Sequence, residues 1–330
     1  NGAETDFTKR VIGLTGEHPR AHLELGRHLR DKGQATEAIT EFLKAIQLDP
    51  NNPIINYELG DVYYREGEFA EAVKKFQRAL ELQTDYVDVF PKLGTIYAHQ
   101  GEWEKAKSFF EKAIELKTDN YSVYSELAEV CEKLDDTDGA IRAFEEALRF
   151  KPGNMGIIYR LGAKYKTKGL FQKMLDLYTK AVELAPRNAL FHFELGEAMR
   201  GLDQLDGAMG KYEDALALNA DLIECIYSLG SIYWERKYYD KMVNLYKKAI
   251  SLYPTNSRAH FELGKAYKKK FNFHDAVEEF KKVINLDVNH PEVHFELGSQ
   301  YLDNGMYREA IDHLRKATNM NAENGEAFFL

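Results

Sequence analysis

Cysteine is nearly absent from this sequence: its 330 residues include only Cys131 and Cys225. Two cysteines cannot build the disulfide framework that stabilises small secreted domains. We expect Cys131 to be a buried thiol, because its position in the repeat described below is tyrosine in other copies, and we do not expect it to pair with Cys225. Since buried thiols occur in reducing and oxidising compartments alike, the sequence is consistent with a cytoplasmic and with a periplasmic location.

Long hydrophobic runs and an excess of positive charge are also missing. No apolar stretch approaches the roughly 20 residues that a helix needs to cross a bilayer, so no transmembrane segment is predicted. A formal net charge of -9 argues against a general nucleic-acid-binding surface, which needs a basic face to displace counterions from phosphates. A lipid-surface adaptor would need a basic amphipathic face or an anchor, and neither is visible.

Catalytic motifs are missing as well. No glycine-rich phosphate loop follows a strand pattern, there is no H-E-x-x-H, and no serine, histidine and aspartate are spaced to share one pocket. We therefore predict that the chain is not an enzyme and that it holds no cofactor and no metal.

What the sequence does contain is a strict period of 34 residues. Small residues mark one phase of it, at Gly26, Gly60, Gly94, Ala128, Gly162, Gly196, Gly230, Gly264 and Gly298. A period without insertions indicates a single array of repeats, in which the length of the chain reflects the number of repeats. It argues against two globular domains.

Each copy reads as two short amphipathic helices. Leu263, Gly264 and Tyr267 form one helical stripe, and after a gap Ala276 and Phe280 begin a second. Small residues at the glycine and alanine positions let the two helices approach closely. Seven of the eight prolines lie at the boundaries between copies, where they end one hairpin or open the next.

This pattern resembles the tetratricopeptide repeat, a helix-turn-helix unit of the same length. The resemblance implies an all-α, right-handed superhelix of nine tandem repeats over residues 19–322. The expected repeats start at residues 19, 53, 87, 121, 155, 189, 223, 257 and 291. Residues 1–18 match the second helix of a preceding partial repeat, and residues 323–330 match the start of a tenth first helix. No polar capping helix closes either end, so we expect the native protein to continue or an uncapped end to pack on another copy.

Several local departures predict repacking or weakness. Met174 and Met242 replace the small alanine, and Phe271 lies at a turn between paired helices. Gly207 and Gly210 lie inside the second helix of the sixth repeat, which we therefore expect to be the least stable helix of the array.

In this family the first helices line a concave groove, so the resemblance implies a protein-interaction scaffold that binds an extended peptide or a partner helix. One groove position is glutamate in six of nine repeats, and the position before it is mostly aromatic. The candidate partner-binding residues are Tyr57, Tyr64, Glu126, Glu129, Tyr159, Phe193, Glu194, Glu197, Tyr227, Trp234, Arg258, Phe261, Glu262, Lys265, Lys268, Lys269 and Phe295. The competing interpretation is that the rings pack between helices and that the glutamates form a solvated face.

Charge is zoned along this series. Glutamates gather in the fourth and sixth repeats, and Arg258, Lys265, Lys268 and Lys269 gather in the eighth. This zoning predicts a partner whose basic part faces the middle repeats and whose acidic part faces the eighth. The alternative function is a substrate-recruiting or self-assembling region of a larger protein whose activity lies outside this chain.

Histidines are the remaining candidates for chemistry. His22, His192, His260 and His294 share one position of the period, and the last two lie in adjacent repeats where they could approach. Structural zinc takes four ligands, and no cysteine or carboxylate completes the set by spacing. We expect these histidines to be partly buried in place of a large aromatic residue.

Overall fold

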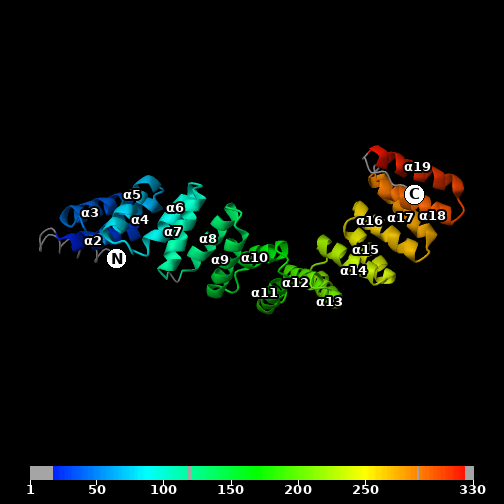
Figure 1. Cartoon of the computed structure of the whole chain (residues 1–330), viewed down its shortest axis with the longest axis horizontal. Coiled ribbons are helices and arrows are strands. Elements are labelled where there is room, and N and C mark those ends of the chain that lie inside the picture. The colour runs from blue at the N-terminus through cyan, green and yellow to red at the C-terminus, as the bar shows by residue number, and fades with distance from the viewer. Residues whose placement is uncertain (1–17, 118–119, 288–289, 324–330) are drawn as a thin grey trace. The chain divides into compact units, whose positions relative to one another are not determined.

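The computed structural model describes residues 18–117, 120–287 and 290–323, which form eighteen α-helices and no strand (Figure 1). The partial repeats predicted for residues 1–18 and 323–330 lie outside the described ranges except for His18, which caps α2, and Glu323, which is the last residue of α19. The chain divides into two compact modules, Asn1–Lys164 and Tyr165–Leu330. The predicted all-α repeat architecture is confirmed, and each module is described by itself below.

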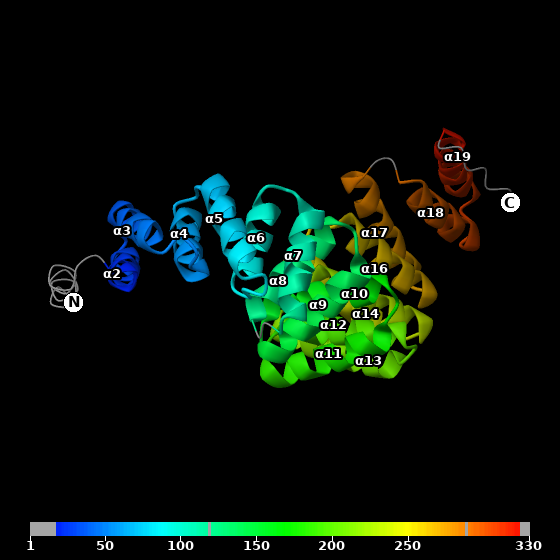
Figure 2. The same ribbon diagram turned by 60° about the vertical axis from the view of Figure 1, so that its left-hand side comes forward.

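The N-terminal module contains four helical hairpins and the beginning of a ninth helix. Its helices are α2 (Pro19–Asp31), α3 (Ala35–Leu48), α4 (Pro53–Arg65), α5 (Phe69–Leu82), α6 (Val89–His99), α7 (Trp103–Glu115), α8 (Tyr121–Lys133), α9 (Thr137–Phe150) and most of α10 (Met155–Thr167). The two helices of each hairpin pack together, and α3, α5 and α7 each pack on the first helix that follows. Figures 1 and 2 show these hairpins following one another in chain order.

The C-terminal module repeats the same arrangement. Its helices are α11 (Phe171–Leu184), α12 (Ala189–Gly201), α13 (Leu205–Leu218), α14 (Ile223–Glu235), α15 (Tyr239–Leu252), α16 (Ser257–Lys269), α17 (Phe273–Leu286), α18 (Pro291–Asp303) and α19 (Tyr307–Glu323). Even-numbered helices are the first helices of their hairpins, and odd-numbered helices are the second. None of the helices in the described ranges is both long and apolar enough to span a bilayer.

Asparagine caps explain where most first helices begin. The side chains of Asn52, Asn120, Asn154, Asn188 and Asn256 accept hydrogen bonds from backbone amides of the first turn that follows them. Such a residue satisfies a donor that the helix cannot pair internally. The helices that follow these five residues begin at residues 53, 121, 155, 189 and 257, which keeps them on the 34-residue period.

Helix α6 begins at Val89, two residues later than the period places it. The physical reason is Pro91. In a helix that began at residue 87, Pro91 would lie in the second turn, where its missing N–H breaks a hydrogen bond and its ring clashes with a carbonyl. Beginning at Val89 puts Pro91 in the first turn, where its nitrogen needs no partner.

The glycine ladder marks where the two helices of a hairpin touch. A Cβ atom added to Gly60 or Gly94 would lie only 2.7–2.8 Å from the ring of Phe76 or Phe110, both of which are fully buried. The second helix therefore rests its aromatic ring directly on the backbone of the first. Cys131 is buried, as expected, and burial raises the pKa of its thiol.

The turns between paired helices need a left-handed residue, and five of them use glycine with φ between 68° and 80°. Phe271 takes the same conformation, with a φ of 57°, and its ring is 96% exposed. A bulky residue is unfavourable there because its Cβ crowds the following carbonyl.

Replacing Gly210 by alanine is expected to stabilise helix α13 by about 1 kcal/mol. The added Cβ meets no atom within 4 Å, so only the helix propensity changes. Gly207→Ala is the matched control, and it should gain less because its Cβ would lie 3.0 Å from the sulfur of Met199. Amide exchange in α13 measures both variants. Exchange in the unmodified α13 as slow as in α7 would contradict the weakness that the two glycines predict.

Candidate partner-binding face of the first helices

Three of the four histidines, His22, His260 and His294, contact a side chain of their own second helix at hydrogen-bond distance through Nδ1. Nδ1 of His22 lies 2.6 Å from Glu41, and Nδ1 of His260 lies 2.5 Å from Glu279. His192 and His260 also contact the carbonyl oxygens of Pro186 and Pro254 through Nε2, at 2.9 and 3.0 Å. All four rings are buried, as expected.

The neighbouring histidines His260 and His294 do not pair, because each meets its own second helix. Nδ1 of His294 lies 2.9 Å from Nδ1 of His313, and burial lowers the pKa of both rings. The described residues contain no group of three or more histidine, cysteine or acidic side chains placed to hold a metal ion. These histidines therefore hold hairpins together.

The aromatic residues that precede the glutamate position, which we call the aromatic row, are Tyr57, Tyr159, Phe193, Tyr227, Phe261 and Phe295. They lie mainly between helices. Tyr57 packs on Phe76 and Tyr86, with ring centroids 5.8 and 5.1 Å apart. Phe261 packs in the same way on Phe280 and His290, at 5.9 and 5.1 Å. Each ring thus joins its own second helix to the start of the next first helix, which is the packing interpretation of this position.

The exposure of the row differs from one ring to the next. Phe261 is 9% exposed and offers little surface to a partner, whereas Phe295 is 40% exposed. Tyr159, Phe193 and Tyr227 are half-buried. Phe193 packs on Tyr212 and Tyr227 on Tyr246.

A ladder of charged side chains links neighbouring first helices, and the sequence analysis did not identify it. In the N-terminal module the buried carboxylate of Glu58, on α4, pairs with Arg27 at 2.7 Å and also with Arg30, both on α2. Asp61, one turn further along α4, pairs with Lys92 of α6 at 2.8 Å. The sequence did contain a signal for this ladder, because residues of opposite charge are separated by 28 residues (Arg30 and Glu58) and by 31 residues (Arg27 and Glu58).

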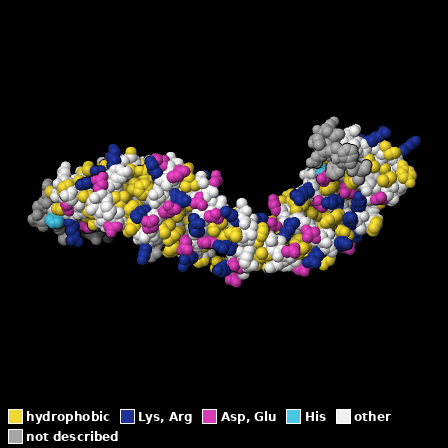
Figure 3. Space-filling model, in the orientation of Figure 1, with side chains coloured by type: hydrophobic (Ala, Val, Ile, Leu, Met, Phe, Trp, Pro, Cys, Tyr) yellow, Lys and Arg dark blue, Asp and Glu magenta, His cyan; other side chains and the backbone are white. Residues whose placement is uncertain are grey.

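The same ladder neutralises most of the glutamates that were predicted to meet a partner. Arg160 pairs with Glu129 at 2.7 Å and also with Glu132, and Lys164 lies 3.1 Å from Glu132. These contacts hold the pKa of Glu132 below its usual value against the effect of burial. Figure 3 shows acidic and basic side chains intermingled over the visible face of the molecule.

In the C-terminal module the carboxylate of Glu197 also has its partners within the chain. It accepts hydrogen bonds from Lys166 at 2.9 Å, from the hydroxyl of Tyr212 at 2.5 Å and from Ser228 at 3.0 Å. Among the described residues the one ion-pair partner of Glu194 is Lys166, at 3.9 Å, and burial raises the pKa of Glu194. The acidic zone of the sixth repeat is therefore largely satisfied by the chain itself.

Glu126 differs from the other glutamates. Its carboxylate accepts a hydrogen bond from Thr95 at 2.6 Å and has no basic side chain within ion-pair distance among the described residues. Burial raises the pKa of Glu126, and the negative charge of Glu129 raises it further. The same carboxylate also raises the pKa of Tyr64, after the larger effect of burial. The charges of His99 and Lys92 act to lower the pKa of Glu126, but neither residue forms an ion pair with it, and the net direction is upward.

A cavity of about 440 Å³ opens beside this carboxylate. Its lining comes from α6, α7 and α8 and consists of Thr95, Ala98, His99, Trp103, Glu126, Glu129, Val130 and Lys133. The sequence analysis missed Trp103, because it took the candidate groove residues from the first helices and Trp103 begins a second helix. The indole face and the carboxylate of Glu126 suit a cation. The other carboxylate, that of Glu129, is already paired with Arg160, and two basic side chains, His99 and Lys133, line the cavity as well.

A second exposed feature lies on α14 and α16. The ammonium groups of Lys265 and Lys269 lie 4.9 and 5.5 Å from the ring of Trp234, and the guanidinium of Arg258 lies 3.9 Å from the ring of Tyr227. We call these five residues the Trp234 cluster. Lys265 also pairs with Glu262 at 3.2 Å, and nearby Lys268 pairs with Glu296 at 2.7 Å. Within the described ranges Lys269 has no carboxylate partner.

Comparison with protein families and solved structures gives three kinds of result. The family model for the cilia and flagella-associated protein 70 C-terminal domain matches residues 3–225. A TPR repeat model matches residues 230–270, and a tetratricopeptide repeat model matches residues 257–290 and 291–324. No curated protein matches the chain.

Among solved structures, the MamA protein is 30% identical over 51% of this chain and 92% of its own, with a TM-score of 0.47. YrrB, described as a TPR protein with an unusual peptide-binding site, is 19% identical over 57% of this chain and 96% of its own, also with a TM-score of 0.47. The P58(IPK) TPR domain is 18% identical over 92% of this chain and 93% of its own, with a TM-score of 0.33.

Proposed function

This chain belongs to the family of the cilia and flagella-associated protein 70 C-terminal domain and is built from tetratricopeptide repeats, and on that premise we propose that it binds an extended peptide or a helix of a partner protein along the exposed face of its first helices. Repeats of this kind are scaffolds for protein interaction. The observation that carries the proposal is the carboxylate of Glu126, which has no ion-pair partner within the described ranges and lies in a cavity beside Trp103.

In the N-terminal module we assign the cavity to a lysine or arginine side chain of the partner. Burial disfavours the ionised form of Glu126, and an incoming cation would remove that penalty. Trp103 lines the same cavity, and tryptophan is the aromatic residue that binds cations best. The cavity is large enough for a side chain but small for a folded element.

In the C-terminal module the Trp234 cluster suits an acidic residue followed by an apolar one. Lys269 is exposed and lacks a carboxylate partner within the described ranges, while Trp234 and Tyr227 offer half-buried rings. Rings bury area with little loss of entropy, and charges set the register of the bound segment. Phe261 contributes by packing beneath this surface.

Binding of a basic peptide is expected to weaken as the pH falls from 7 to 5. The pKa of Glu126 is raised, so this carboxylate takes up a proton at a higher pH than an ordinary glutamate and then loses its attraction for a cation. The probe is a fluorescein-labelled peptide with two arginines in a glycine-serine background. Its counterpart, with both arginines replaced by citrulline, has the same shape without the charge. Fluorescence anisotropy measures both.

Glu126→Gln is expected to reduce the affinity for the arginine peptide about tenfold and to remove the pH dependence. Glu24→Gln is the matched control, because Glu24 takes the same position of the period but is half exposed and already paired with Arg27. Equal affinity for the arginine and citrulline peptides, or affinity independent of ionic strength, would show that the charge of Glu126 has no role in binding.

A second candidate function is that this chain is the recruiting or self-assembling region of a larger protein. One observation favours it: the matching family model describes a C-terminal domain. The flanking gene sequence tests it, because a catalytic domain there would assign recruitment to these repeats. Sedimentation velocity over a wide concentration range tests self-association.

A further inference from the structure

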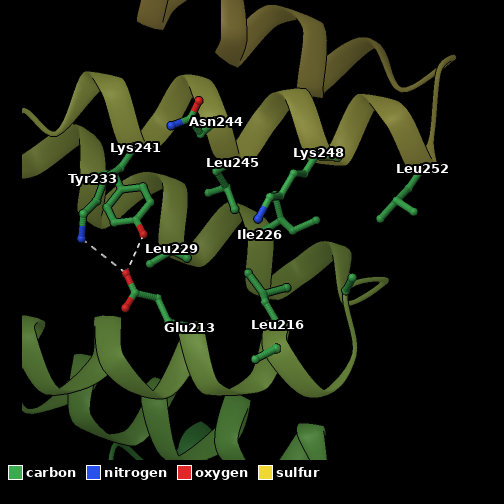
Figure 4. A pocket seen from close by; sticks show the side chains of 13 residues that line it. Glu213, Leu216, Ile226, Leu229, Tyr233, Lys241, Asn244, Leu245, Lys248 and Leu252 are labelled. Carbon is green, nitrogen blue, oxygen red and sulfur yellow. Dashed lines mark hydrogen bonds and ion pairs between the residues drawn. The ribbon is translucent and has the colours of Figure 1, made fainter.

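A second cleft lies within the C-terminal module, on the side formed by second helices. Helices α13 and α15 form its walls and α14 forms its floor (Figure 4). Its volume is about 420 Å³, and its lining residues are mostly apolar. None of these residues belongs to the candidate face of the first helices.

The cleft has a local cause in the sequence of the seventh repeat. Met242 occupies the position that is alanine at Ala72, Ala208 and Ala276, so the α14–α15 hairpin has a larger side chain where its helices should meet. Helix α15 accordingly packs less closely on α14 than α13 does on α12 or α17 on α16. The two helices of this hairpin are therefore less closely packed than those of the neighbouring hairpins.

The neighbouring ring shows the same displacement. A Cβ added to Gly230 would lie 2.1 Å from the hydroxyl oxygen of Tyr246, whereas one added to Gly264 would lie 2.6 Å from the ring edge of Phe280. The tip of Tyr246 therefore touches the glycine, while in the eighth repeat the side of the ring does. A tyrosine at this position does not by itself cause the difference, because Tyr212 of the closely packed α12–α13 hairpin places its ring edge 2.6 Å from the Cβ built on Gly196. In the seventh repeat the hydroxyl contact accompanies the looser packing of α15 on α14.

Charge inside the cleft is uneven. At one end Glu213 accepts a hydrogen bond from the hydroxyl of Tyr233 at 2.8 Å and lies 3.5 Å from Lys241, so these polar groups satisfy one another. Lys248 also lines the cleft but has no carboxylate partner within the described ranges. Figure 4 shows its side chain running from α15 toward the floor. The cleft is thus open and mostly apolar, and it carries one exposed ammonium group outside an ion pair.

We propose that this cleft binds a fatty acid of medium chain length, with the carboxylate at Lys248 and the alkyl chain against Ile226 and Leu229. The volume lies in the range of small-molecule sites, and such sites combine apolar walls with few polar groups that fix orientation. The ammonium of Lys248, which unlike that of Lys241 has no carboxylate partner within the described ranges, lies beside an apolar floor and complements an amphiphile with an anionic head. It disfavours a cationic head of the same length.

Three probes with the same alkyl chain test the charge requirement by isothermal titration calorimetry on the full chain: dodecanoate, dodecanol and dodecyltrimethylammonium, each below its micelle concentration. Dodecanoate should bind about fivefold more tightly than dodecanol, as a single partly exposed ion pair allows, and the cationic probe should bind most weakly. Lys248→Gln should abolish the difference between dodecanoate and dodecanol. Lys180→Gln, at the same position of α11, is the matched control and should change nothing.

A double variant tests the cleft itself. Met242→Ala with Tyr246→Phe gives the seventh repeat the alanine and phenylalanine that the second and eighth repeats carry, so α15 should close on α14 and binding of all three probes should be lost. Wild-type protein that binds none of the probes overturns the proposal. So does dodecanoate affinity that survives both Lys248→Gln and the double variant, because the ligand then lies elsewhere. If the double variant fails to fold by circular dichroism, the Lys248→Gln result decides alone.

Discussion

Replacing Phe110 by alanine is expected to lower the free energy of unfolding of the α6–α7 hairpin by about 3–5 kcal/mol. The ring is fully buried and rests on the backbone of Gly94, where an added Cβ would lie only 2.7 Å away. Because Gly94 has no side chain to move into the space, the cavity cannot collapse. A repeat contacts only its neighbours, so few other interactions compensate.

Amide exchange of α6 and α7 in the full chain measures this loss, because an array of repeats need not unfold in one step. Phe150→Ala is the control: this ring is 42% exposed and stacks on Tyr124 at 5.6 Å, so its removal should cost about 1 kcal/mol or less. If the two variants lost equal stability, the contact between ring and glycine would not be what holds each hairpin together.

Glu58→Ala is expected to destabilise the N-terminal module by about 3 kcal/mol. The carboxylate is 8% exposed and joins two arginines of the preceding first helix. Burial acts to lower the pKa of Arg30, but the negative charges of Glu58 and Asp31 outweigh it and hold that pKa above its usual value. Removing Glu58 leaves Arg30 only 16% exposed with a weaker set of partners. The estimate lies at the low end for a buried pair because Arg27 keeps contact with water.

Chemical denaturation with a double-mutant cycle against Arg30→Ala measures the coupling between the two helices. Glu24→Ala is the control, since Glu24 has the same position one repeat earlier, is 51% exposed and should cost less than about 1 kcal/mol. A coupling energy near zero would show that the ion pairs between first helices contribute nothing to stability.

The sequence by itself determined the architecture, because the repeat is local. The contact of Gly94 with Phe110 and the burial of Cys131 follow from positions within one copy. The start of α6 was misplaced by two residues because the period took no account of Pro91, although that proline was itself visible in the sequence. The histidine position was correctly expected to be buried, but its carboxylate partners on the second helix were not foreseen.

Only the tertiary structure decided which side chains remain available to a partner. The groove glutamates read as an acidic face in sequence, yet Glu58, Glu129 and Glu197 are paired by residues of neighbouring repeats, whereas Glu126 has no ion-pair partner within the described ranges. Likewise Met242 was recognisable as a departure, but not the cleft behind it. The physical reason is the same in both cases. Secondary structure depends on neighbours along the chain, whereas charge compensation and cavities depend on how closely stacked helices approach.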